Sequence, residues 1–290
     1  MADRRAKSKP EQAQKSYEKI LQQETTEGLK EIERPSLGLF ISGLSAGLDL
    51  TFSLILMATM MTLIHHTLPA PVTEILVADM YSVGFIFVVL GRSELFTEHT
   101  TRAFYPVFTG YASVGSLLRL WGLIYAGNII GSAAFAKLVT VIGPALGIIN
   151  PAVFGEIGRQ VVGHSWWVIG LSAVLAGWLM GLLSWLVTAG RDTISQVFFV
   201  WLITFALGFC HFHHAILGNS ETLAAVFTGS VSPGQYGFSL LWSTVGNAVG
   251  GGVFVALLKY SHVMYGGDEP DPVVLTKAGE ISQSEDQLSG

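Results

Sequence analysis

The sequence decides its fold in one stretch: Gly208-Phe209-Cys210-His211-Phe212-His213-His214-Ala215-Ile216-Leu217-Gly218-Asn219-Ser220-Glu221. It lies inside a long apolar run that begins near Ile194 and resumes after Glu221. A charged side chain at the centre of a membrane costs about 2.5–3.5 kcal/mol on insertion scales, so such residues persist where they face protein or water. A helix breaks at that depth only where protein or a water-filled cavity covers the backbone. The stretch therefore predicts a broken membrane helix beside a solute path.

The composition supports a membrane protein. Of 290 residues, 50% are hydrophobic and 13% are charged, with a mean hydropathy of +0.52. Soluble domains carry about 25% charged residues. Eight of the 16 lysines and arginines precede Pro35, and the acidic residues gather near the two ends. A single cysteine, Cys210, excludes an internal disulfide, and the polar first 36 residues contain no apolar segment typical of a signal peptide.

Six apolar spans are expected from the need for about 20 residues per crossing. We expect an all-α integral membrane protein with a cytoplasmic polar segment (1–36), a six-span channel domain (37–260) and a disordered cytoplasmic tail (261–290). Within the first segment, an interfacial amphipathic helix and a disordered stretch remain alternatives. The second and fifth spans contain polar interruptions. The expected spans are 38–64, 73–105, 114–142, 166–189, 194–229 and 236–260.

The two halves of the chain repeat each other. Gly43-Leu44-Ser45-Ala46 matches Gly170-Leu171-Ser172-Ala173, and Gly127-Asn128-Ile129-Ile130-Gly131 matches Gly246-Asn247-Ala248-Val249-Gly250. A repeat of three spans reverses the chain direction, so the repeats must have inverted topology. Paired broken helices in such repeats indicate a binding site near the middle of the membrane. Glycines four residues apart also let helix backbones approach closely.

The positive-inside rule predicts the orientation. With the N-terminus inside, one face holds the eight basic residues of the first segment together with Arg102, Arg119, Arg191 and Lys259, whereas the opposite loops hold Arg159. Both termini are therefore expected to be cytoplasmic.

These features resemble the formate/nitrite transporter family over roughly residues 37–260. The resemblance is carried by Glu94-Leu95-Phe96-Thr97 in the second span and His214-Ala215-Ile216-Leu217 in the fifth, together with the Gly-Asn-x-x-Gly segments of the third and sixth. It implies an aquaporin-like protomer, a homo-pentamer in a bacterial inner membrane, His214 as the central pore histidine and Thr97 as its hydrogen-bonding neighbour.

Several positions depart from the family pattern, which indicates a divergent branch. Glu98-His99 stands where many members have Gly-Asn, and Gly218 stands where the family has asparagine. Arg92 occupies a position that is usually small, and the lysine expected before the fourth span is absent, with Arg159 or His164 as candidate substitutes.

His214 has an ordinary pKa suited to proton exchange near neutral pH, so we expect it to give a proton or a hydrogen bond to a weak-acid anion in the pore. Thr97 is expected to donate its hydroxyl to the imidazole, or to cap the second half-helix, or both. Alternatively, His214 is a histidine that bonds two helices. The other residues expected on the solute path are Glu94, Phe96, Asn128, Asn219, Glu221 and Asn247, with Leu90 and Phe209 as hydrophobic constrictions.

The leading hypothesis is a channel or transporter for small monovalent weak-acid anions of the formate, nitrite, acetate or hydrosulfide class. The carboxylates Glu94, Glu98 and Glu221 keep a neutral-solute or cation/proton pore open as an alternative. A metal transporter or membrane metalloenzyme built on the histidines, and a non-conducting scaffold, are less favoured. No P-loop, nucleophile elbow or dinucleotide motif is present, so we expect no enzyme activity, cofactor or bound metal, and no nucleic-acid partner.

Overall fold

The computed structural model describes residues 15–64 and 67–265, and all regular elements within these ranges are helices. The predicted tail after residue 265 lies outside the described residues. In chain order the elements are α1 (Tyr17–Glu33), α2 (Ser36–Leu50), α3 (Phe52–Ile64), α4 (Ala70–Gly91), α5 (Phe96–Arg102), α6 (Phe104–Phe108), α7 (Val114–Ala145), α8 (Pro151–Val162), α9 (Trp166–Ala189), α10 (Thr193–Phe209), α11 (Ala215–Phe227), α12 (Pro233–Val249), the π-helix η1 (Gly250–Leu257) and α13 (Leu258–Tyr265).

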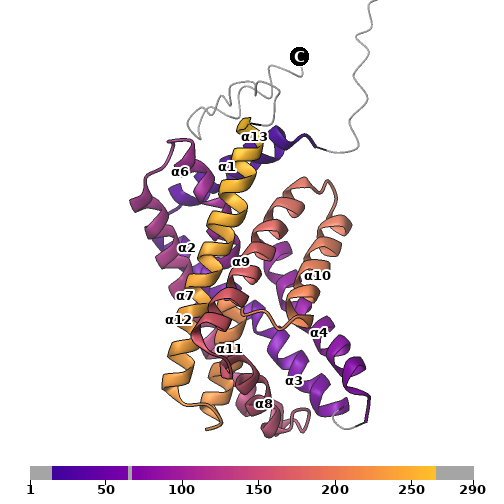
Figure 1. The fold of residues 1–290 in the computed structure, drawn as a ribbon. Coiled ribbons are helices and arrows are strands. Elements are labelled where there is room, and N and C mark those ends of the chain that lie inside the picture. The colour runs from indigo at the N-terminus through magenta and orange to yellow at the C-terminus, as the bar shows by residue number, and fades with distance from the viewer. Residues whose placement is uncertain (1–14, 65–66, 266–290) are drawn as a thin grey trace, which may run out of the picture.

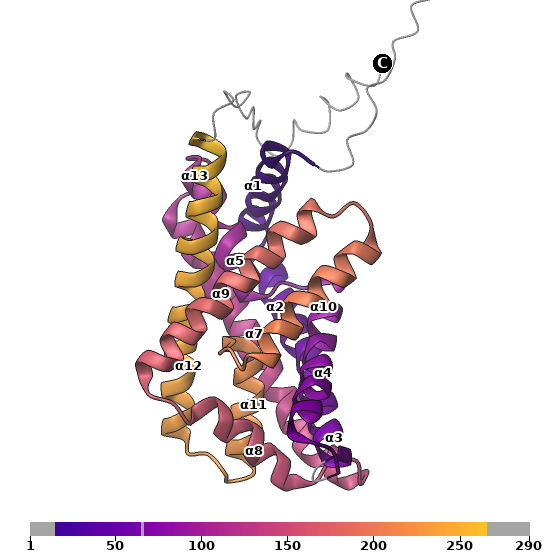
Figure 2. The same cartoon turned by 45° about the vertical axis from the view of Figure 1, so that its right-hand side comes forward.

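The structure confirms an all-α membrane fold with broken second and fifth spans. Five helical rods of the described chain are long and apolar enough to cross a membrane: Ser36–Ile64, Ala70–Gly91, Val114–Ala145, Trp166–Ala189 and Pro233–Tyr265. The shorter apolar helices α10 and α11 together form the remaining crossing. The second span is α4 followed by the seven-residue α5. In Figures 1 and 2, α1 and α13 lie at one end of the bundle and α8 lies at the other.

The two halves use the same close helix crossing. A Cβ atom added to Gly47 on α2 would lie 2.3 Å from the carbonyl oxygen of Asn128 on α7, and one added to Gly177 on α9 would lie 2.2 Å from that of Asn247 on α12. Neither crossing tolerates a side chain at the glycine. The halves are therefore built alike, as the repeat predicted.

The register of the repeat differs from the one that the sequence match implied. In the structure Gly47 corresponds to Gly177. Gly43 therefore does not correspond to Gly170, and the sequence match that paired these two glycines is shifted by three residues. A Cβ atom added to Gly170 would have Trp242 as its nearest neighbour at 3.9 Å, so a side chain fits at this position. A glycine is required only at the point of closest approach, so glycine identity alone gave the wrong alignment.

Two short elements go beyond the expected spans: helix α8 lies between the third and the fourth span, and the π-helix η1 lies within the sixth. Helix α8 starts at Asn150, whose side chain accepts the Ala152 backbone N–H at 3.1 Å, and it buries Val153, Phe154 and Ile157. The π-helix η1 brings Gly251 against α5, where the Thr101 hydroxyl donates to the Gly251 carbonyl at 3.0 Å. Both elements therefore pack against the half-helices, α8 on α11 and η1 on α5.

Candidate functional site at the junction of the broken helices

The two interruptions share one backbone conformation. Arg92 after α4 has φ of 55° and His211 after α10 has φ of 52°, and these are the two non-glycine residues with positive φ in the described chain. Such a left-handed conformation costs about 1–3 kcal/mol at a non-glycine residue, so it persists where the surrounding structure enforces it. The helices of the two halves are therefore interrupted at equivalent positions.

Asn128 and Asn247 hold the two breaks by identical sets of hydrogen bonds. The Asn128 side chain accepts the Phe96 N–H at 2.8 Å and donates to the carbonyls of Gly43 at 2.8 Å and Glu94 at 2.9 Å. Asn247 repeats this pattern in the second half, where it accepts from Ala215 at 2.7 Å and donates to Ala173 at 2.8 Å and His213 at 2.9 Å. These amides satisfy the backbone groups that a broken helix would otherwise leave unpaired.

The half-helices meet at a hydrogen bond between His214 and Thr97. The His214 Nε2 atom lies 2.7 Å from the Thr97 hydroxyl oxygen, and both residues are almost fully buried. The Leu217 backbone N–H donates to His214 Nδ1 at 3.1 Å, so His214 caps α11. The ring of Phe85 stands edge-on to the imidazole at a centroid distance of 5.0 Å. Residues 117 positions apart in the chain therefore meet at one point.

The cap determines which atom carries the imidazole proton. Because Nδ1 accepts the Leu217 N–H, a neutral ring must carry its proton on Nε2. That N–H then donates to the Thr97 oxygen, which is the reverse of the direction that the sequence analysis expected. The Thr97 hydroxyl proton is left free to point at a third group. The pair therefore keeps one hydrogen-bond donor that it does not use itself, the Thr97 O–H.

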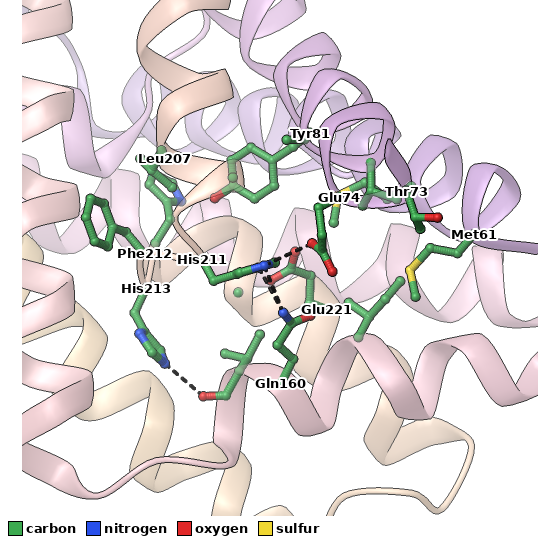
Figure 3. Close-up of a pocket in the computed structure, with 18 residues that line it drawn as sticks. Met61, Thr73, Glu74, Tyr81, Gln160, Leu207, His211, Phe212, His213 and Glu221 are labelled. Atoms are coloured by element: carbon green, nitrogen blue, oxygen red, sulfur yellow. Dashed lines mark hydrogen bonds and ion pairs between the residues drawn. The ribbon is translucent and has the colours of Figure 1, made fainter. Parts of the chain in front are cut away.

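A cavity of about 80 Å³ lies on the side of the junction that faces α8, and we call it the α8-side cavity (Figure 3). His214 and Glu221 line it together with Phe212 and Leu207. Its polar rim joins His211 to the Glu74 carboxylate at 3.0 Å and to the Gln160 amide at 2.9 Å. Neither Glu74 nor Gln160 stood out in the sequence, because their role depends on helices α4 and α8 meeting at His211.

A second, larger cavity lies on the opposite side of the junction, next to α1, and we call it the α1-side cavity. Its volume is about 620 Å³. Leu90, Arg92 and Glu94 line it from the first break, and Glu27 and Glu31 line it from α1. No residue lines both cavities. The buried His214–Thr97 pair therefore lies between two separate hollows.

Several residues expected on the solute path have structural contacts instead. Asn128 and Asn247 bind backbone groups, as described above. Phe96 packs edge-on against Tyr125 at 5.0 Å, and Asn219 donates to Ser132 at 2.7 Å and accepts from Tyr236 at 2.8 Å. Phe209, expected as a hydrophobic constriction, is 45% exposed and stacks on Phe205. These residues line neither of the two cavities.

Helix α1 docks on the half-helix α5 through buried charges. Arg102 of α5 contacts carboxylates of Glu31 at 3.1 Å, Glu24 at 3.5 Å and Glu98 at 2.8 Å. Glu24 has no exposed surface, and it accepts hydrogen bonds from Ser184 at 3.0 Å and from Thr188. Of the two alternatives for the first segment, the structure thus has a helix, and its buried face packs on protein.

His99 completes this network, and its contacts identify the group as ion pairs and not as a metal site. Its Nδ1 lies 2.7 Å from Glu31, its Nε2 contacts Glu94, and Glu94 also pairs with Arg34. Glu31, Glu94 and His99 are the one group with metal-type spacing among residues 15–64 and 67–265. Because the two carboxylates engage opposite nitrogens of the ring, the three residues form an ion-pair chain. His211, His213 and His214 have different partners and do not converge.

The contribution of Glu31 to the docking of α1 is expected to be insensitive to pH between 5 and 8. Burial alone would raise the pKa of Glu31, but His99 and Arg102 outweigh it and hold this pKa at about 2. A lowered carboxyl pKa gives stability that is complete above the ordinary value of about 4.3 and is lost only as pH falls toward the lowered one. Hydrogen exchange along α1 should therefore be the same at pH 5.5 and 7.5 after correction for intrinsic rates, whereas Glu31→Gln should speed it at both. Exchange that rises steeply at pH 5.5 in the native chain would contradict this account.

The fold and the two facing breaks define a multi-pass helical membrane protein of the transport class. The family model described as formate/nitrite transporter matches residues 18–261. The chain therefore belongs to the formate/nitrite transporter family, whose members are channels and transporters.

Curated relatives and solved structures agree with this assignment. The chain is 28% identical to inner membrane protein YfdC of Escherichia coli (strain K12), over 88% of this chain and 80% of that protein. It is 26% identical to the nitrite transporter NirC of the same strain, over 76% and 82%. A solved structure titled FNT family ion channel superposes with a TM-score of 0.75 at 21% identity, covering 83% of this chain and 97% of that one. A pentameric formate channel with formate bound gives 0.67 at 22% identity, over 79% and 97%.

Proposed function

We propose that this chain conducts small monovalent anions of weak acids, such as formate, nitrite, acetate or hydrosulfide, through the His214–Thr97 junction. The observation that carries the proposal is the orientation of that pair. Because His214 donates to Thr97, the Thr97 O–H stays available as a donor to a solute at the junction, and donors stabilise anions. An anion that enters the junction exchanges lost water contacts for this hydrogen bond.

The surroundings of the junction support an anion path. Helix α11 begins at Ala215, and its N-terminus places the positive end of the helix dipole beside His214. The side chain of Arg92 lines the α1-side cavity and forms no ion pair or hydrogen bond with the described residues, so its charge is available to a solute. The family relationship to anion transporters points the same way.

Assembly and orientation follow as further parts of this proposal. We expect a homo-pentamer in a bacterial inner membrane, since a structural relative is a pentameric formate channel and a curated relative is an inner membrane protein. The positive-inside rule places α1 and both termini in the cytoplasm. The α1-side cavity then opens toward the cytoplasm, and the α8-side cavity opens toward the other face.

A flux panel in proteoliposomes tests the substrate class. Purified chain in vesicles should admit labelled formate, nitrite and acetate faster than protein-free vesicles, and it should admit neither glycerol nor potassium. The panel also tests the alternative that Glu221 and Glu94 favour, a cation or neutral-solute pore. Entry of potassium or glycerol without entry of any of the anions would overturn the proposal.

A further inference from the structure

His214 is poorly placed to carry a proton. To become an imidazolium it would need a proton on Nδ1, which now accepts the Leu217 N–H at 3.1 Å. Protonation would set two N–H groups against each other and remove the α11 cap. A neutral imidazole, for its part, has no acidic proton to give near neutral pH. His214 is therefore a hydrogen-bond donor, and a proton that accompanies an anion must come from another group.

Glu221 is the titratable group that the α8-side cavity leaves without a partner. It is 6% exposed, and its carboxylate forms no hydrogen bond or ion pair within residues 15–64 and 67–265. Glu221 follows His214 by seven residues on α11, which is nearly two helical turns, and both line the same cavity. Its carboxylate lies beside Gly218, where an added Cβ would be 4.0 Å from Oε2. Isolated carboxylates are seldom buried without a cation or a proton.

The other titratable groups that face this cavity either have hydrogen-bond or ion-pair partners or do not titrate near neutral pH. His211 pairs with Glu74 at the rim, and His213 contacts the Val161 carbonyl through Nε2 and the Ser172 hydroxyl through Nδ1, each at 2.9 Å. Tyr81 from α4 lines the cavity, but a phenol ordinarily titrates near pH 10.

The remaining helices that pack on α11 add no charge to the cavity wall. Helix α3 contributes Met57 and Met61, and α8 contributes Ile157, Gln160 and Val161. Charged residues on α5, α7 and α8 do not line this cavity. Arg102 and His99 of α5 contact Glu31 of α1, Glu98 pairs with Arg102, and Lys137 of α7 lies over the Phe227 ring. Figure 3 shows Glu221 among Glu74, His211 and Gln160.

We propose that Glu221 carries the proton that crosses with the anion, which makes transport an electroneutral symport of one proton with one weak-acid anion. The proposal rests on the function given above. An anion that enters the α8-side cavity takes the proton from the Glu221 carboxylic acid: the O–H bond of the acid breaks, and an O–H or S–H bond forms on the anion. The neutral acid crosses the junction and ionises in the α1-side cavity. The Glu221 carboxylate regains a proton from water on the α8 side.

The test uses full-length chain in proteoliposomes with a pH dye inside and a potassium diffusion potential set by valinomycin. Native protein should acidify the interior by one proton per formate, at a rate that is unchanged by a potential of either sign. Glu221→Gln keeps the size of the side chain and removes the acidic proton. We expect it to slow formate entry by about tenfold or more and to make the remaining entry depend on the potential. Glu221→Asp should restore part of the rate and the proton uptake.

The controls separate this inference from the proposed function. Glu33→Gln removes an exposed carboxylate at the end of α1 and should change neither rate nor proton uptake, and each variant should match the native chain in its elution volume from size-exclusion chromatography. Native protein that admits no anion would end the proposed function. Native protein that admits formate with net charge transfer, or a Glu221→Gln variant with the native rate and one proton per formate, would overturn the role of Glu221 and leave anion conduction standing.

Discussion

Asn247→Ala is expected to lower the melting temperature of the detergent-purified chain by about 10 °C. The substitution removes three hydrogen bonds to buried backbone groups, namely the Ala215 N–H and the carbonyls of Ala173 and His213. Each loss costs about 1 kcal/mol or more, so the total is about 3 kcal/mol. For a chain of this size, about 1 kcal/mol corresponds to roughly 2–4 °C.

Two further variants calibrate this prediction. Asn128→Ala removes the equivalent three bonds of the first half and should have a similar effect, since the sets match in partners and distances. Asn150→Ala removes one exposed capping bond of α8 and should cost about 1 kcal/mol. If Asn247→Ala has a melting temperature no lower than that of Asn150→Ala, the buried asparagine side chains do not hold the broken helices in place.

His214→Asn is expected to slow formate entry by about 10- to 100-fold while the fold is retained. Asparagine is among the best residues at a helix N-cap, so α11 should keep its start at Ala215. The shorter side chain cannot reach Thr97, and the hydroxyl loses the donor that orients it toward the solute. A hydrogen bond to a charged group is worth about 1.5–3 kcal/mol, which corresponds to the predicted factor. Native flux in a correctly folded His214→Asn variant would show that the permeant does not depend on this pair.

The sequence was sufficient to predict the breaks and their meeting point. Polar residues such as His214 and Glu94 interrupt apolar runs that are otherwise long enough to span a membrane, and the cost of burying them restricts where they lie. The resemblance then paired His214 with Thr97, and the structure places the two 2.7 Å apart. What the pattern did not give was the direction of that bond, because it is set by the backbone of Leu217.

The role of the buried amides was harder to predict. Asn128 and Asn247 were expected on the solute path, since an amide in an apolar span must have a polar partner. The sequence shows that partners are needed but not which ones, and the free backbone groups exist only because other helices break nearby. The constriction expected at Phe209 stays a prediction, because hydrophobic residues line pores and face lipid alike and the sequence does not distinguish the two.

Two of the residues that depart from the family pattern have a structural role in α1 docking. Glu98 contacts Arg102 at 2.8 Å, and His99 contacts Glu31 at 2.7 Å. From its sequence the charged first segment resembled a solvated tail, because the partners of its acidic residues lie on α5, about 70 residues further along the chain. Docking therefore depends on contacts that local composition does not reveal.

Formate entry into proteoliposomes with Thr97→Val, compared with Thr97→Ser, tests the central claim most directly. Valine matches threonine in shape but lacks the hydroxyl, whereas serine keeps it. The account predicts that Thr97→Ser stays within about twofold of the native rate and that Thr97→Val falls by about tenfold or more, the loss of a hydrogen bond to a charged solute. Equal rates for Thr97→Val and the native chain would contradict passage of the anion past this hydroxyl.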